Sequence, residues 1–189
     1  MLRYIILLCC FLVVYSTNMA IIALNMQNIY CDEDSIMFVE GCTSAISNMN
    51  YLFGITIDDN IYPITITNIH QSKDNNIEII HGIDGIEKKT FKESSEIIDE
   101  LDTPKATKHF YMSTYSITKE EIFMNFLEVN KIKDIVLGGV YISNSAKDLV
   151  CLGYKVYIYL PAVGFLSSQD KQKNINEWIN LGININYEP

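Results

Sequence analysis

Several polar residues that could do chemistry come directly after, or at the end of, apolar segments of the sequence. They are Asn25, Asn68 together with His70, Lys108, and Ser145 behind a glycine turn. Because the carboxyl ends of parallel strands meet at one crevice of a sheet, we expect these residues to converge although they are far apart in sequence. A serine beside a base suits nucleophilic catalysis.

The catalytic interpretation depends on finding a base. Ser145 needs a neighbouring group that takes its proton, and Asn25 is one of the polar residues expected at the same crevice. An amide cannot act as a general base at neutral pH. Lys108 could do so only if desolvation lowered its pKa. The residues therefore leave open whether a nucleophile exists here.

The elements that must position these residues follow a strand–helix alternation. Residues 135–137 and 156–160 are apolar and rich in β-branched side chains, and they bracket Gly138, Gly139 and a short amphipathic segment. This pattern predicts a βαβ unit, which builds parallel sheets. Further strands are expected at 20–24, 61–67, 106–110 and 183–187, and further helices at 43–53, 92–101, 116–127 and 167–181. The predicted fold class is α/β, a doubly wound parallel sheet of about six strands with helices on both faces.

Length and composition limit the function classes. The chain has 189 residues, of which 49% are hydrophobic and 20% charged, as in a globular domain. We expect one domain over residues 19–189. A net charge of −9 without a basic patch argues against nucleic acid as a partner.

The first eighteen residues allow two interpretations. Arg3 precedes an uncharged apolar run over residues 5–15, and small polar residues follow, as in a secretory signal peptide. This run is shorter than the roughly 20 residues that a membrane-spanning helix needs. Alternatively, Met19 is the true start. The first interpretation predicts a protein of the secretory pathway, and the second a cytoplasmic one.

The cysteines predict reduced thiols rather than a disulfide framework. Five are present, with no Cys-x-x-Cys pair and no zinc spacing: Cys9, Cys10, Cys31, Cys42 and Cys151. An odd, scattered set is typical of a reducing compartment. Cys151 is expected on the buried side of the helix that follows the glycine turn.

Several short motifs, in this order, resemble one known family. They are MAIIALNMQN, Val39-Glu-Gly-Cys-Thr, Asn68-x-His70, His81-Gly-Ile-Asp-Gly85, Lys108-His-Phe-Tyr111, Gly139-Val140, Ser145-Ala-Lys-Asp148 and Gly153-Tyr154-Lys-Val156. Together they resemble the isochorismatase-like cysteine hydrolases, and among these most closely the nicotinamidases. The resemblance covers residues 19–187.

The resemblance implies a reaction and a set of roles. A cysteine thiolate at a helix N-terminus attacks an amide carbon, an aspartate moves the proton, and a lysine, here Lys108, holds charges in place. Backbone N–H groups at Gly139 and Val140, beside a cis peptide bond, form an oxyanion hole. Asn68, His70 and His81 would hold a divalent metal such as zinc, manganese or iron. A homo-oligomer is also implied.

The sequence departs from that pattern at its reactive positions. Asn25 replaces the aspartate, and Asn68 replaces the aspartate of the metal set, which removes a ligand charge. Ser145 replaces the cysteine if one counts from Gly139. Counted back from Gly153, the nucleophile falls in a gap of about one helical turn. Two hypotheses follow, a rebuilt amide hydrolase with a serine or water nucleophile and a non-catalytic protein that binds a small molecule or another subunit. A third is that the encoded sequence at 134–150 has lost a turn carrying the cysteine.

Overall fold

The computed structural model describes residues 18–35, 37–56, 59–68, 78–80, 88–90 and 95–187. Its main sheet contains six strands in the order β5-β2-β1-β6-β7-β8, and all neighbours are parallel. The strands are β1 (Asn18–Leu24), β2 (Ile61–Asn68), β5 (Lys108–Met112), β6 (Ile132–Val140), β7 (Lys155–Gly164) and β8 (Asn184–Asn186). The sheet confirms the predicted α/β fold class.

The central strands are buried on both faces, which explains their nearly continuous apolar sequences. Residues 20–24 of β1 are all at most 3% exposed. Parallel sheets need such runs because crossover helices cover both of their faces. Strand β7 runs four residues beyond its expected end, and its register with β6 shifts between Leu137 and Gly139.

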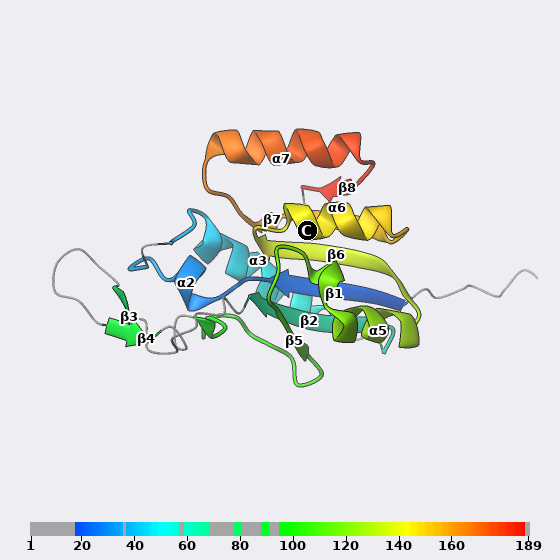
Figure 1. Ribbon diagram of the computed structural model, residues 1–189, viewed down its shortest axis with the longest axis horizontal. Coiled ribbons are helices and arrows are strands. Elements are labelled where there is room, and N and C mark those ends of the chain that lie inside the picture. Colours follow the sequence, from blue (N-terminus) through cyan, green and yellow to red (C-terminus); the bar gives the residue numbers. More distant parts are fainter. Residues whose placement is uncertain are drawn as a thin grey trace, which may run out of the picture.

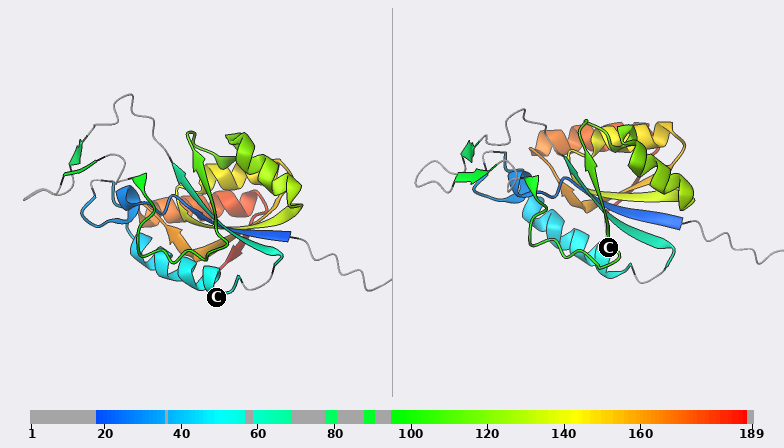
Figure 2. Two further views of the ribbon diagram at one scale, coloured as in Figure 1. Left: turned by 90° about the horizontal axis from the view of Figure 1, so that it is seen from below. Right: turned by 60° about the horizontal axis from the view of Figure 1, so that its bottom comes forward.

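Helices cover the sheet on two sides, as Figures 1 and 2 show. One core layer lies between the sheet and α3 (Cys42–Gly54), with α2 (Asn28–Cys31) beside it. The other layer lies under α5 (Glu121–Val129), α6 (Ser143–Cys151) and α7 (Ser168–Asn180). The 3-10 turn η1 (Ile117–Lys119) precedes α5. The result is three layers around two apolar cores.

Two expectations about local structure need correction. Residues 96–101, part of the segment expected to be helical over 92–101, form bends and turns with one bridge between Gln27 and Ile97. The strand expected at 106–110 is displaced and runs from Lys108 to Met112. The helices expected at 43–53 and 167–181 are present as α3 and α7, and the edge strand β8 follows α7.

Two further short strands, β3 (Glu78–Ile80) and β4 (Lys88–Thr90), form an antiparallel pair apart from the main sheet. Within the described part of the chain, each helix is too short or too polar to cross a membrane.

Candidate functional site

The strand order reverses between β1 and β6, and ligands of open parallel sheets usually bind at such a point. Asn25 comes directly after β1, is 2% exposed, and has a left-handed backbone with φ 57°. Its Nδ2 donates a hydrogen bond to the carbonyl oxygen of Val140, the last residue of β6, at 3.0 Å. Its Oδ1 is buried and has no hydrogen-bond partner among the described residues. The side chain therefore ties the two strand ends together across the reversal point.

The backbone at the end of β6 packs tightly against β1. Gly139 has φ +114°, and a Cβ placed on it would collide with the carbonyl oxygen of Leu24. Only glycine fits this combination of conformation and close approach. The peptide bond before Val140 is trans, so the prediction of a cis bond at this position is wrong. The oxyanion-hole role of Gly139 and Val140 stays a prediction.

Two tyrosines lie next to this turn. Tyr141 follows Val140 with φ 55°, and its ring meets the ring of Tyr30 edge to face, with centroids 5.3 Å apart. Burial, with a smaller contribution from Tyr141, raises the pKa of Tyr30 to about 12. Burial and the nearby carboxylate of Asp170 also raise the pKa of Tyr141. Both phenols are therefore neutral at physiological pH and do not serve as bases.

The hydroxyl of Ser145 does not face open space. Ser145 lies in the first turn of α6 and is 0% exposed. Its Oγ accepts a hydrogen bond at 3.2 Å from the backbone N–H of Ile117 in η1. This contact explains the residue structurally, since it satisfies a buried N–H and joins α6 to η1. A nucleophile must reach its substrate, and this conformation does not allow that.

The expected position of Lys108 is wrong. Lys108 begins β5 and pairs with Ile64 in the middle of β2, whereas Met112 pairs with Asn68 at the carboxyl end. At about 3.3 Å per residue, Lys108 lies roughly 13 Å before that end. The residue that does occupy it is Met112, which is apolar and 2% exposed. Lys108 is instead exposed on an edge strand.

A polar residue that the sequence analysis did not select organises the neighbouring strand ends. Gln27 is 0% exposed, and its Oε1 accepts a hydrogen bond from the backbone N–H of Asn68 at 2.8 Å. Its Nε2 donates to the carbonyl oxygens of Asn68, at 3.1 Å, and of Ser95, at 2.7 Å. Gln27 thereby joins the ends of β1 and β2. Gln27 belongs to the MAIIALNMQN motif, and this motif is the sequence signal that could have identified it.

The metal site predicted at Asn68, His70 and His81 stays a prediction. Asn68 ends β2 and is 8% exposed, while His70 and His81 lie outside the described residues. Among the residues that the structure describes, no group of three or more His, Cys, Asp and Glu side chains could hold a metal ion. Asn68 would offer an uncharged amide oxygen where a carboxylate binds divalent ions better. We therefore assign no chemical step to a metal.

The cysteine predictions are wrong in two respects. Cys31, at the end of α2, and Cys42, at the start of α3, form a disulfide with their Cα atoms 5.2 Å apart. Both are buried, at 3% and 0% exposure. Cys151 is a free thiol on the exposed side of α6, not the buried one. The pairing could not be foreseen from spacing because it depends on how α2 packs on α3.

A cavity of about 160 Å³ opens beside the reversal point rather than in it. It lies at the carboxyl ends of β6 and β7 and at the beginnings of α6 and α7, and Val140 and Tyr141 contribute to its wall. None of the predicted catalytic side chains, Asn25, Lys108 and Ser145, lines it. The structure thus separates the predicted reactive residues from this cavity.

Comparisons with known proteins give a clear result only at the level of structure. No protein-family model and no curated protein matches the sequence. An isochorismatase-like hydrolase from Alkaliphilus metalliredigens is 19% identical, covers 90% of this chain and 93% of its own, and has a TM-score of 0.75. A pyrazinamidase from Pyrococcus horikoshii in complex with zinc is 17% identical over 90% and 99% of the chains, with a TM-score of 0.73. An L. infantum protein in complex with nicotinate is 13% identical over 90% and 93%, with a TM-score of 0.71.

The fold is that of the isochorismatase-like hydrolases. This agrees with the expectation from the motifs. A shared isochorismatase-like fold does not by itself carry the reaction, because function depends on the residues of the site. At the carboxyl ends of β1 and β5 and in the first turn of α6, this chain has an amide tied to Val140, an apolar methionine and a buried hydroxyl.

Proposed function

We propose that this protein is a small-molecule-binding protein with the isochorismatase-like hydrolase fold, in which amide hydrolysis is lost or severely weakened. The observation that carries the proposal is the environment of Asn25, Met112 and Ser145 at the carboxyl edge of the sheet. Covalent amide hydrolysis needs an accessible nucleophile, a proton acceptor and a stabilised oxyanion. None of these three residues supplies either of the first two.

The hydrogen bonds of these residues favour structural roles. Asn25 Nδ2 has a backbone acceptor in Val140, and Ser145 Oγ has a backbone donor in Ile117. A side chain that satisfies a buried backbone group stabilises the fold by about 1 kcal/mol or more, which a catalytic role would have to give up. The rebuilt-hydrolase hypothesis also needs Lys108, which the register of β5 places far from the crevice.

Two parts of the family resemblance stay predictions for this chain. A pyrazinamidase of this fold was solved with zinc and an L. infantum protein with nicotinate. These neighbours support a small-molecule ligand and, more weakly, a divalent metal at Asn68, His70 and His81. Self-association is likewise a prediction.

Ammonia release tests the proposal. The full chain is incubated at high concentration with nicotinamide, pyrazinamide and acetamide, with and without zinc or manganese. We expect no ammonia above that of the buffer. Turnover that is lost in Ser145→Ala but kept in the matched variant Ser44→Ala, an exposed serine on α3, would show a rebuilt active site and contradict the proposal.

We also propose that the chain folds in an oxidising compartment. The buried Cys31–Cys42 disulfide supports this, because such bonds persist mainly in secreted and secretory-pathway proteins. The apolar run at residues 5–15 is consistent with the same route. Mass spectrometry of the protein from its natural source, alkylated before reduction, would test it. Recovery of both cysteines as alkylated free thiols would contradict it.

A further inference from the structure

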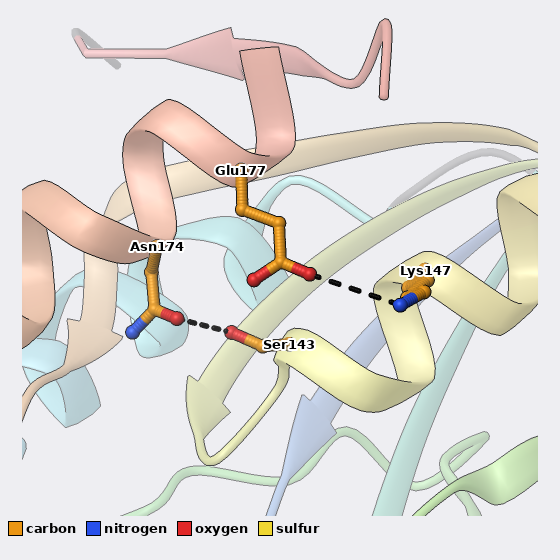
Figure 3. Close-up of polar contacts among 4 residues, drawn as sticks. All are labelled: Ser143, Lys147, Asn174 and Glu177. Carbon is orange, nitrogen blue, oxygen red and sulfur yellow. Dashed lines mark hydrogen bonds and ion pairs between the residues drawn. The ribbon is translucent and has the colours of Figure 1, made fainter. Parts of the chain in front are cut away.

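The residues predicted to catalyse amide hydrolysis, Asn25, Lys108 and Ser145, do not line the cavity between α6 and α7. Figure 3 shows the two helices side by side, with Ser143 Oγ donating to Asn174 Oδ1 at 2.9 Å. Both of these residues line the cavity, and the ion pair between Lys147 and Glu177, 4.0 Å long, lies farther along the helices and outside its lining. The cavity of about 160 Å³ thus has a polar side held in place by contacts between the two helices.

The cavity wall contains one charged side chain, a carboxylate. Asp170 is the one acidic residue in its lining, and no Lys, Arg or His shares the wall. Asp170 is fixed in position, since its backbone N–H donates to Ser167 Oγ at 3.1 Å and its Oδ1 accepts from Asn174 Nδ2 at 3.0 Å. Its Oδ2 accepts from the backbone N–H of Leu166 at 3.3 Å. These donors are all neutral, and in the described part of the chain no ion pair neutralises the carboxylate.

The remaining wall is mostly apolar and includes three aromatic residues. Tyr141, Phe165 and Trp178 contribute rings to it, and the rings of Phe165 and Trp178 have centroids 6.1 Å apart. The faces of aromatic rings attract cations, most strongly at tryptophan. Phe165 already interacts with one, because the ammonium of Lys171 lies 5.7 Å from its centroid. A carboxylate and three rings together favour a positively charged organic ligand.

Trp178 is the most buried of the three aromatic residues of the wall. It is 1% exposed, and its Nε1–H has no hydrogen-bond partner among the described residues. This N–H has almost no accessible surface, so a ligand in the cavity does not reach it. A metal ion fits less well, since hard cations need several oxygen ligands and both Asp170 oxygens already accept hydrogen bonds.

We propose that this cavity binds a small organic ammonium ion. The positive nitrogen lies near the carboxylate of Asp170 and against the aromatic part of the wall. A cavity of about 150 Å³ holds benzene, so a ligand of about six to eight non-hydrogen atoms fits. This site does not depend on the proposed loss of hydrolysis, because it shares no side chain with Asn25, Met112 or Ser145.

Calorimetric titration of the full chain tests this site with matched probes. Choline carries a quaternary ammonium and a hydroxyl, and 3,3-dimethylbutan-1-ol has the same shape without the charge. We expect choline to bind at least tenfold more tightly than the neutral alcohol, and its affinity to fall as salt is raised. Equal affinities would show a merely apolar pocket. Failure of choline, ethanolamine and tetramethylammonium all to bind the folded protein would also overturn the proposal.

Variants locate the binding. Asp170→Asn keeps the size of the side chain and removes its charge, and we expect it to weaken choline binding at least tenfold. Glu177→Gln removes a charge from the same helix outside the cavity, and affinity should stay within twofold. Because Asp170 also accepts the backbone N–H of Leu166 just before α7, Trp178→Phe provides a second test and should weaken choline binding severalfold. Unchanged affinity in both folded cavity variants would contradict the assignment.

Discussion

Reduction of the Cys31–Cys42 disulfide is predicted to destabilise the protein by a calculable amount. The two cysteines are separated by 11 residues, and the bond restricts the unfolded chain more than the folded one. In the chain-entropy treatment, a loop of this length loses about 9 cal/mol/K of unfolded-state entropy on closure. At 25 °C this corresponds to about 2.8 kcal/mol, a large part of the 5–15 kcal/mol typical of a domain.

Urea unfolding with and without a phosphine reductant measures this loss without removing any atom from the core. The chain has one tryptophan, Trp178, which is buried and provides the fluorescence signal. The m value should rise on reduction, because the unfolded chain then exposes more surface. Cys151→Ser serves as the control, since this exposed thiol should contribute less than about 0.5 kcal/mol.

Either of two results would contradict the predicted effect of this disulfide. One is a change of less than about 0.5 kcal/mol in the free energy of unfolding on reduction, well below the entropic value. The other is complete alkylation of Cys31 and Cys42 in the unreduced, urea-unfolded protein.

Three further predictions concern the carboxyl edge of the sheet. Gly139→Ala should lower the free energy of unfolding in urea by at least about 3 kcal/mol, because the new Cβ would collide with the Leu24 backbone and φ is positive. Gly54→Ala is the control: a Cβ there meets free space, and the free energy of unfolding should change by no more than about 1 kcal/mol. The raised pKa of Tyr30 predicts a contribution to stability that is complete below pH 10 and lost as pH rises towards 12, and Tyr30→Phe should remove this contribution but not that of Tyr141, whose pKa is also raised. Asn25→Asp should lower the free energy of unfolding by about 3 kcal/mol at pH 8, since a buried carboxylate then faces the Val140 carbonyl oxygen in place of an N–H donor. Burial raises the pKa of that carboxyl, so the variant should regain stability as pH falls, and equal losses at pH 5 and pH 8 would contradict this.

Much of the fold could be predicted because its signals are local. The apolar runs of β1, β6 and β7 and the amphipathic pattern of α3 each lie within one short segment. Parallel pairing then follows from the alternation of strands and helices. The end of β1 just before Asn25 was predictable for the same reason.

The errors concern features that depend on pairing between distant segments. The position of Lys108 is set by the register of β5 on β2, and an edge strand exposed on one side has too weak a pattern to fix it. The strand ends two residues later than expected, at Met112, which leaves Lys108 four residues before its carboxyl end. The Cys31–Cys42 bond and the contact of Ser145 with Ile117 likewise join separate elements. Sequence spacing alone carries no information about such contacts.

Proton NMR of nicotinamide incubated with the full chain tests the loss of amide hydrolysis most directly, because the ring signals of the amide and of nicotinate are distinct. At equimolar protein, over a day and with zinc or manganese added in parallel, the account predicts that only nicotinamide signals remain. Growth of nicotinate signals with the wild-type chain, but not with Ser145→Ala, would contradict it.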